Sequence, residues 1–260
     1  MNSDYYPLQK FVGREISDKL KANIKVSVKG NMYLYNYNNK VIVKRNNPIL
    51  IKCRGLVLDY NGNVLNYPFD RFFNSYERES VDIDWDSAKI TEKIDGSLVC
   101  VFWNGKDWEV TTRGSFYPNP YADIDYAQKF KSLFDEFDKL EKTYCYMFEM
   151  CSNDNRIVKW YDEEFVALIG MRNLRTLNEI DPTQESKYLG VRSPKSYKAN
   201  NLEECKKLFS LLEDDDEGFV IVDVYYNRIK VKQDSYLALS KIKMLKEDDI
   251  LEYVLSLIHI

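Results

Sequence analysis

Two Asn-Gly pairs, each between short runs of apolar and β-branched residues, constrain the fold more than any other feature of this sequence. The pairs are Asn61-Gly62, between residues 56–59 and 64–67, and Asn104-Gly105, between residues 99–103 and 108–112. Asn and Gly tolerate the positive φ angles of the tight turns that join antiparallel strands. The sequence therefore predicts two β-hairpins and, with them, antiparallel sheets.

The rest of the chain is expected to mix strands and helices without a regular alternation. Apolar residues at helical spacing predict helices at residues 8–20, 126–140, 202–212 and 237–255. Further strands are predicted at residues 24–28, 32–37, 41–43, 145–150, 157–161, 165–171, 219–224 and 229–232, and a polar loop at 176–200. This order predicts an α+β fold with antiparallel sheets and inserted helices around a cleft. No linker or repeat divides residues 1–245, which we expect to form one domain, with a short C-terminal tail at 246–260.

A single lysine precedes an Asp-Gly pair in the segment Thr91-Glu92-Lys93-Ile94-Asp95-Gly96-Ser97-Leu98. Lysine becomes a nucleophile only where burial or neighbouring cations lower its pKa. A strand-turn-strand corner is a candidate position of that kind for Lys93. Asp95 and Gly96 are expected to shape the turn, and Gly96 to let a ligand approach the backbone. The alternative is an ordinary hairpin turn with a solvated lysine.

Composition limits both the residue types available for catalysis and the cellular compartment expected for the protein. The only histidine is His259, so catalytic triads and metal sites that depend on histidine are effectively excluded. Catalysis must then use Lys, Asp, Glu, Cys or a metal held by carboxylates. The five cysteines form no Cys-x-x-Cys pair, and neither a secretory signal nor a membrane-spanning apolar run is visible. We therefore expect a cytoplasmic protein with reduced thiols and no membrane partner.

The distribution of charge favours a site for nucleic-acid ends over a surface that coats long nucleic acids. The net charge is −4, which argues against bulk electrostatic binding. A local basic cleft is compatible with this value, because affinity depends on where the phosphate-facing cations lie. Cationic residues fall within the short segments that also carry other motif residues, at Lys52, Arg54, Arg71, Arg113, Arg156, Lys230 and Lys232.

Further motifs accompany the lysine in a fixed order along the chain. They are Lys52-Cys53-Arg54-Gly55, Tyr67-Pro68-Phe69-Asp70-Arg71-Phe72-Phe73-Asn74, Thr111-Thr112-Arg113-Gly114, Tyr146-Met147-Phe148-Glu149-Met150, Asn155-Arg156-Ile157-Val158, Asp216-Glu217-Gly218-Phe219 and Arg228-Ile229-Lys230-Val231-Lys232. This set resembles the covalent nucleotidyltransferase superfamily of polynucleotide ligases and capping enzymes. The first two segments are similar to those of ATP-dependent RNA ligases of the phage tRNA-repair type. The resemblance extends from about Lys52 to about Tyr236 and implies an adenylyltransferase domain with a nucleotide-binding cleft.

The resemblance implies roles for the lysine and for three glutamates. Lys93 would attack the α-phosphate of ATP, and ATP and Mg²⁺ are the expected cofactors. Glu92 would contact the adenine edge and Glu149 the ribose. A role for Glu149 is also favoured because a carboxylate within an apolar strand is costly to bury without a partner. Glu217 would lie near the metal, which suits the preference of Mg²⁺ for oxygen ligands.

Arginine and lysine residues are the candidates for phosphate binding. The resemblance implies that Arg54 contacts the triphosphate or pyrophosphate, whereas Arg71 and Arg113 stand where some relatives have lysine. The planar guanidinium pairs well with phosphate oxygens. Lys230 and Lys232 point to one face of a strand, where they would hold phosphate and favour the neutral form of the nucleophile by repulsion. The alternatives are surface salt bridges for the arginines and a solvated strand face for the lysines.

These observations predict an ATP-dependent RNA ligase that joins 3′-hydroxyl and 5′-phosphate ends through a lysyl-AMP intermediate. The expected partners are RNA ends, single-stranded or in a broken stem-loop, with single-stranded DNA as a further candidate. The alternatives are a DNA ligase, a GTP-dependent capping enzyme and a non-catalytic nucleotide-binding module. Relatives of this type usually carry a further C-terminal domain, whereas this chain ends soon after Lys232.

Overall fold

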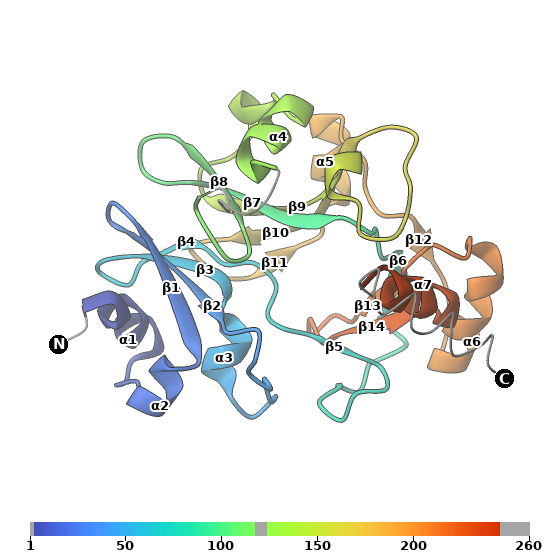
Figure 1. Cartoon of the computed structure of the whole chain (residues 1–260), viewed down its shortest axis with the longest axis horizontal. Coiled ribbons are helices and arrows are strands. Elements are labelled where there is room, and N and C mark those ends of the chain that lie inside the picture. The colour runs from blue at the N-terminus through green and yellow to red at the C-terminus, as the bar shows by residue number, and fades with distance from the viewer. Residues whose placement is uncertain (1–2, 118–123, 245–260) are drawn as a thin grey trace, which may run out of the picture.

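The computed structural model describes residues 3–117 and 124–244, and these residues form three β-sheets (Figure 1). The first sheet has the order β1-β2-β3-β4, with bounds Ile24–Lys29, Met32–Tyr37, Arg54–Asp59 and Val64–Asn66. The second has the order β11-β10-β9-β7-β8, with bounds Glu179–Ile180, Phe165–Asn173, Tyr144–Cys151, Ser97–Trp103 and Trp108–Thr112. The third has the order β12-β6-β13-β14-β5, with bounds Ser196–Tyr197, Lys89–Glu92, Gly218–Val222, Arg228–Lys232 and Phe73–Asn74.

Neighbouring strands in these sheets are antiparallel, except that β5 runs parallel to β14. Both predicted hairpins are confirmed as β3–β4 and β7–β8. Gly62 and Gly105 in their turns have φ angles of +86° and +100°, which glycine adopts without steric cost. The predicted α+β class with antiparallel sheets is confirmed.

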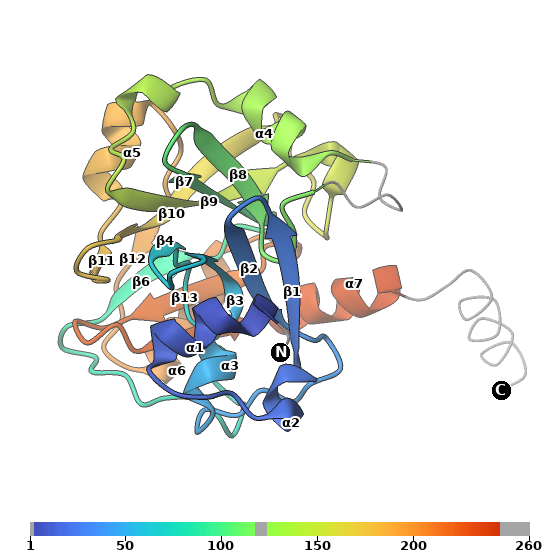
Figure 2. The same cartoon turned by 90° about the vertical axis from the view of Figure 1, so that its left-hand side faces the viewer.

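Helices cover the outer faces of the three sheets (Figures 1 and 2). The α-helices are α1 (Tyr6–Val12), α2 (Asp18–Lys21), α3 (Pro48–Lys52), α4 (Tyr126–Leu133), α5 (Thr183–Leu189), α6 (Leu202–Lys207) and α7 (Asp234–Met244). Short 3₁₀ helices lie at Ser3–Tyr5, Phe137–Lys139, Asn153–Asn155 and Leu208–Leu211. The first three α-helices belong to the first sheet, α4 and α5 contact the second, and α6 lies beside the third.

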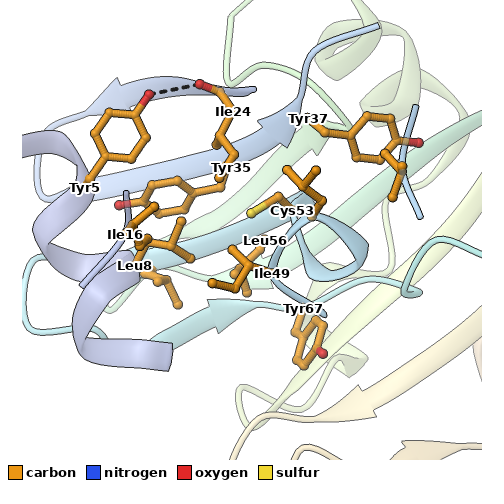
Figure 3. Packing of buried hydrophobic residues seen from close by; sticks show 13 residues of the cluster. Tyr5, Leu8, Ile16, Ile24, Tyr35, Tyr37, Ile49, Cys53, Leu56 and Tyr67 are labelled. Carbon is orange, nitrogen blue, oxygen red and sulfur yellow. Dashed lines mark hydrogen bonds between the residues drawn. The ribbon is translucent and has the colours of Figure 1, made fainter. Parts of the chain in front are cut away.

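Each sheet packs its own apolar layer against these helices. In the first core, the ring of Tyr35 is fully buried, and Tyr5 donates a hydrogen bond to the carbonyl of Ile24 at 2.9 Å (Figure 3). In the second core, Phe130 of α4 lies 5.1 Å, ring to ring, from Phe148 of β9. In the third, Phe219 of β13 is buried near Cys205 of α6. Because strand side chains alternate, the residues between these core positions face the other way.

Three predicted helices differ in extent from the structure. The helix expected at 8–20 is two helices, because α1 ends at Gly13, which has a φ angle of +68°. The one expected at 126–140 ends at Leu133, since Phe134 is extended, and a 3₁₀ turn follows. The one expected at 202–212 also changes to a 3₁₀ helix after Lys207.

Other predictions are wrong or fall partly outside the described residues. Residues 41–43 form no strand, because the chain turns there, with the amide of Val41 bonded to the carbonyl of Asn38. Residues 157–161 form no strand either, for a reason that lies in the site described below. Residues 176–200 contain β11, α5 and β12 rather than a loop alone. The helix expected at 237–255 begins earlier, and both its end and the tail expected at 246–260 lie outside the described residues.

Two further sequence features have structural counterparts. All five cysteines are buried and unpaired. Across residues 3–117 and 124–244, no helix has both the length and the apolar character that crossing a bilayer requires.

Candidate active site

A cavity of about 940 Å³ lies where the three sheets meet. In β13, Phe219 and Ile221 belong to the core, whereas Val220 and Val222 line the cavity. The same alternation in β9 buries Phe148 in the core and turns Glu149 toward the cavity. The volume is typical of small-molecule sites.

Lys93 lies in the wall of this cavity, directly after β6. Its amide donates to the carbonyl of Gly218 at 2.8 Å, which joins the turn to the start of β13. Its Nζ donates to Oε2 of Glu217 at 2.7 Å, and Nζ of Lys232 lies 2.5 Å from Oε1 of the same carboxylate. Glu217 therefore holds two lysines, one on each oxygen, and only 6% of its side chain is exposed.

This ion pair makes Lys93 a cation. Burial by itself would lower the pKa of Lys93, but the carboxylates of Glu217, Glu149 and Asp95 raise it above its ordinary value. The lowered pKa expected of the nucleophile is therefore not found in this arrangement, because the three carboxylates outweigh the repulsion between Lys93 and Lys230. The lowering occurs at Lys230, where burial and the charges of Lys93 and Lys232 bring the pKa to about 8.

Asp95 anchors the turn that carries Lys93. Its Oδ2 accepts hydrogen bonds from the amides of Val158 and Lys159, both at 2.8 Å. Its Oδ1 accepts from the hydroxyl of Tyr236 at 2.6 Å, and its own amide donates to the hydroxyl of Tyr161 at 3.1 Å. Residues 157–161 are bent around this carboxylate, which is why they form no strand. As expected, Asp95 shapes the turn.

Gly96 lines the cavity, but the space beside its backbone is filled by protein. A Cβ built there would lie 2.6 Å from the carbonyl oxygen of Met150 and 3.0 Å from Sγ of Cys151. The close approach that requires glycine here is to β9, and the expectation that Gly96 lets a ligand approach the backbone stays a prediction.

The two carboxylates predicted to bind the nucleoside both line the cavity. Burial raises the pKa of Glu149 to about 7, and the nearby charges of Lys93 and Arg54 act in the opposite direction. Oε2 of Glu92 accepts a hydrogen bond from the amide of Lys195 at 3.2 Å, and the amide of Glu92 donates to the carbonyl of Lys195 at 2.8 Å. Glu92 thereby fixes the segment before β12 beside the turn that carries Lys93.

The three predicted phosphate-binding arginines gather near one tyrosine, Tyr37. The guanidinium of Arg71 donates to its hydroxyl at 2.9 Å, and that of Arg113 lies 5.6 Å from the centre of its ring. Burial would raise the pKa of Tyr37, but the bond from Arg71 and the charges of Arg54, Arg71 and Arg113 lower it. Arg54 and Arg113 line the cavity, whereas Arg71 is not among the residues that line it.

Nη1 of Arg54 is buried and has no hydrogen-bond partner among the described residues. Burial lowers the pKa of this guanidinium, and the charge of Arg113 adds to the effect. A buried cationic donor without a partner costs free energy unless an anion pairs with it. The arrangement fits a bound phosphate group.

The structure thus brings all ten predicted residues to one region, in two groups. Those that line the cavity are Arg54, Glu92, Lys93, Gly96, Arg113 and Glu149. The other four adjoin the cavity without lining it. Arg71 is bonded to Tyr37, Glu217 is paired with Lys93 and Lys232, and Lys230 lies near both lysines. Among the described residues, no group of three acidic, cysteine or histidine side chains could hold a metal, so Glu217 would need ligands from a substrate and water.

Sequence reasoning missed Tyr37 and Tyr236. No motif residue is adjacent to Tyr37 in the sequence, and its hydrogen-bond partner Arg71 is 34 positions away. Tyr236 bonds to a carboxylate 141 positions earlier. Both contacts depend on the fold, and a single sequence carries no signal for them.

Comparison with known proteins settles the family. A family model described as RNA ligase matches residues 52–236. The chain belongs to the RNA ligase family. An RNA ligase of Rhodothermus phage RM378 is 29% identical over 297 residues, which cover 86% of this chain and 67% of that protein. A protein of Autographa californica nuclear polyhedrosis virus, named as a bifunctional polynucleotide kinase/RNA ligase, is 29% identical over 256 residues. That match covers 88% of the present chain but only 36% of the viral protein.

Solved structures show the same fold at low sequence identity. One form of an archaeal ATP-dependent RNA ligase has a TM-score of 0.64 and 16% identity, and the match covers 92% of this chain and 66% of that one. A protein from Aquifex aeolicus named as an ATP-dependent DNA ligase has a TM-score of 0.58 and 12% identity, with 92% and 68% covered. At these identities, the similarity of the present chain to the two solved structures concerns the fold alone.

Proposed function

We propose that this chain is an ATP-dependent RNA ligase that joins 3′-hydroxyl and 5′-phosphate ends through a lysyl-AMP intermediate. The observation that carries the proposal is the placement of Lys93 in the wall of a cavity that is also lined by Arg54, whose buried Nη1 has no hydrogen-bond partner among the described residues. Family membership supports RNA as the polynucleotide.

In the first step, Nζ of Lys93 attacks the α-phosphate of ATP. A nitrogen–phosphorus bond forms, the bond from the α-phosphorus to the bridging oxygen breaks, and pyrophosphate leaves. The neutral amine releases one of its two protons to solvent and keeps the other in the phosphoramide. Because Glu217 holds Lys93 as a cation, attack requires that the amine leave this carboxylate and become neutral. Lys230 and Lys232 lie close enough to favour the neutral amine once the pair with Glu217 is broken.

The other residues bind and orient the substrate. Arg54 and Arg113 would pair with the phosphates, since both line the cavity and carry planar donors. Glu149 and Glu92 would contact the ribose and the base. Glu217 would hold Mg²⁺ through its carboxylate, a mode in which substrate phosphates complete the ligand set. Bound Mg²⁺ would neutralise charge on the phosphoryl group that is transferred.

Two later steps complete the proposed reaction. AMP is transferred from Lys93 to the 5′-phosphate of an RNA end, and the 3′-hydroxyl of a second end then displaces AMP to form the phosphodiester bond. We place this reaction in the cytoplasm, in keeping with five unpaired, buried thiols.

The proposal is tested by comparing substrates at one low salt concentration, since phosphate contacts make affinity salt-dependent. The purified chain, ATP and Mg²⁺ are incubated with a 5′-phosphorylated single-stranded RNA, a broken RNA stem-loop, single-stranded DNA or a nicked DNA duplex. We expect an RNA end to be joined fastest. Faster sealing of the DNA nick would assign the chain to DNA repair, and GMP transfer from GTP would indicate a capping enzyme.

A further inference from the structure

A basic hollow of about 530 Å³ lies on the surface outside the catalytic cavity. Its lining residues are Lys44, Arg45, Asn46, Arg78 and Glu79. Lys44 and Arg45 belong to the loop after β2, and Arg78 and Glu79 to the loop after β5. Both loops lie at the lower edge of Figure 1, and a hydrogen bond between Arg45 and Glu79 joins them. The lining thus contains three cations and one carboxylate, on a chain whose net charge is −4.

Within residues 3–117 and 124–244, no side-chain ion pair neutralises the cations of this hollow. Oε2 of Glu79, the acidic lining residue, accepts a hydrogen bond from the backbone amide of Arg45 at 2.7 Å. Neither Lys44, Arg45 nor Arg78 forms a side-chain ion pair with another residue that the structure describes. Clustered like charges repel one another, and a bound polyanion relieves that repulsion.

Both loops of the hollow begin at the catalytic site. The loop after β2 starts beside Asn39, which lines the catalytic cavity and accepts a hydrogen bond from Arg113 at 3.5 Å. The loop after β5 starts at Ser75, whose amide donates to the carbonyl of Lys230 at 2.9 Å. Arg71 lies between the two starting points, because it bonds to Tyr37 at the end of β2 and lies 4.9 Å from the ring of Phe73 in β5. The two loops therefore connect the cations of the catalytic cavity with the cations of the hollow.

We infer that the hollow binds backbone phosphates of the RNA strand whose end is held in the catalytic cavity, an inference that rests on the proposed function. Lys and Arg contact phosphates without reading sequence. An exposed aromatic ring supports a nucleic acid as the occupant, since unpaired bases stack on such rings. Tyr76, two residues before Arg78, is 69% exposed. The phosphates of ATP belong instead with Arg54 in the cavity.

The test uses two double variants that change net charge equally. Lys44→Glu with Arg78→Glu alters the hollow, and Lys131→Glu with Lys187→Glu alters exposed residues of α4 and α5, at the upper edge of Figure 1. For each protein, the Kd for a 5′-phosphorylated single-stranded RNA is measured over a series of salt concentrations, and self-adenylation is measured with ATP alone. The hollow variant should bind RNA about tenfold or more weakly at low salt, and the slope of log Kd against log salt should fall by about two. The control should match the parent protein, and all three should adenylate equally.

Equal RNA affinity and slope in the two variants would overturn the inference. Loss of adenylation in the hollow variant alone would also overturn it, by assigning the hollow to the nucleotide. Failure of the parent protein to bind or join RNA would instead contradict the proposed function. If the double variant does not fold, Tyr76→Ala and Tyr76→Phe decide the question. The Phe variant keeps the ring and its affinity, whereas the Ala variant should lose about fivefold or more, and equal affinity would contradict the inference.

Discussion

At the scale of single residues, the candidate site is a set of buried charges that shift one another's protonation. Glu217 holds Lys93 and Lys232 on its two oxygens, and their positive charges lower its pKa despite its burial. Glu149, in the same region, has no such ion pair among the described residues, and burial raises its pKa. Perturbed pKa values of this kind are frequent at functional sites.

The raised pKa of Glu149 predicts a pH-dependent stability that a glutamine should remove. Its pKa rises from 4.5 to about 7 on folding, so its protonated form contributes stability that is fully present below the unfolded pKa and lost as the pH rises through about 7. Relative to the parent, Glu149→Gln should therefore gain about 1–3 kcal/mol of unfolding free energy between pH 5 and pH 8. Urea unfolding at both pH values checks this. Glu163→Gln, at an exposed carboxylate, serves as the control, and a parallel pH response of the Glu149 variant and the parent would refute the account.

At the scale of elements, the turn at residues 93–96 is fixed by strands on both sides. The amide of Lys93 bonds to the first residue of β13, and Gly96 lies against the backbone of β9. The second and third sheets are thus joined at the turn that carries Lys93.

This close contact predicts that Gly96→Ala is destabilising. The new Cβ would lie 2.6 Å from the carbonyl oxygen of Met150, so the turn or β9 must move. We expect a loss of about 1–3 kcal/mol in unfolding free energy together with slower adenylation, because Lys93 moves with the turn. Gly114→Ala is the matched control, since its nearest neighbour is 3.4 Å away at the side chain of Asn36. Similar stability of the two variants would show that the contact with β9 is not restrictive.

The sequence was a good guide where structure is local and a poor one where it depends on distant partners. The Asn-Gly turns located both hairpins, and the order of motifs identified ten residues that the fold brings together. Residues 157–161 have the composition of a strand but bond to Asp95, 63 positions earlier in the case of Val158. The two-residue strand β5 exists only through its pairing with β14. Helix α5 was missed because its residues are mostly polar, so apolar periodicity does not reveal it.

At the scale of the whole molecule, a largely buried carboxylate connects the three sheets. Glu179 of β11 pairs with Arg172 of β10 at 2.8 Å and with Arg228 of β14 at 2.6 Å. Nε of Arg172 also donates to the carbonyl of Tyr67, just after β4, at 2.9 Å. The walls of the cavity therefore keep their relative positions partly through one side chain.

Removal of this carboxylate should destabilise the molecule strongly. Glu179→Ala leaves two largely buried guanidiniums without their partner, which predicts a loss of about 3–5 kcal/mol in unfolding free energy. Glu163→Ala breaks an exposed pair with Arg192 and should cost about 0–1 kcal/mol. Urea unfolding of both variants measures the difference, and comparable losses would mean that Glu179 does not connect the sheets as described.

The most direct test of the central claim is whether AMP becomes covalently attached to Lys93. The chain is incubated with α-labelled ATP and Mg²⁺, unfolded, digested, and the labelled peptide is identified. Lys93→Arg is the decisive variant, because arginine keeps a cation opposite Glu217 but stays protonated and cannot act as the nucleophile. We predict that the parent protein carries label on Lys93 alone, and that Lys93→Arg unfolds at the same urea concentration but retains no label. Label on Lys93→Arg, or on another lysine of the parent protein, would contradict the account.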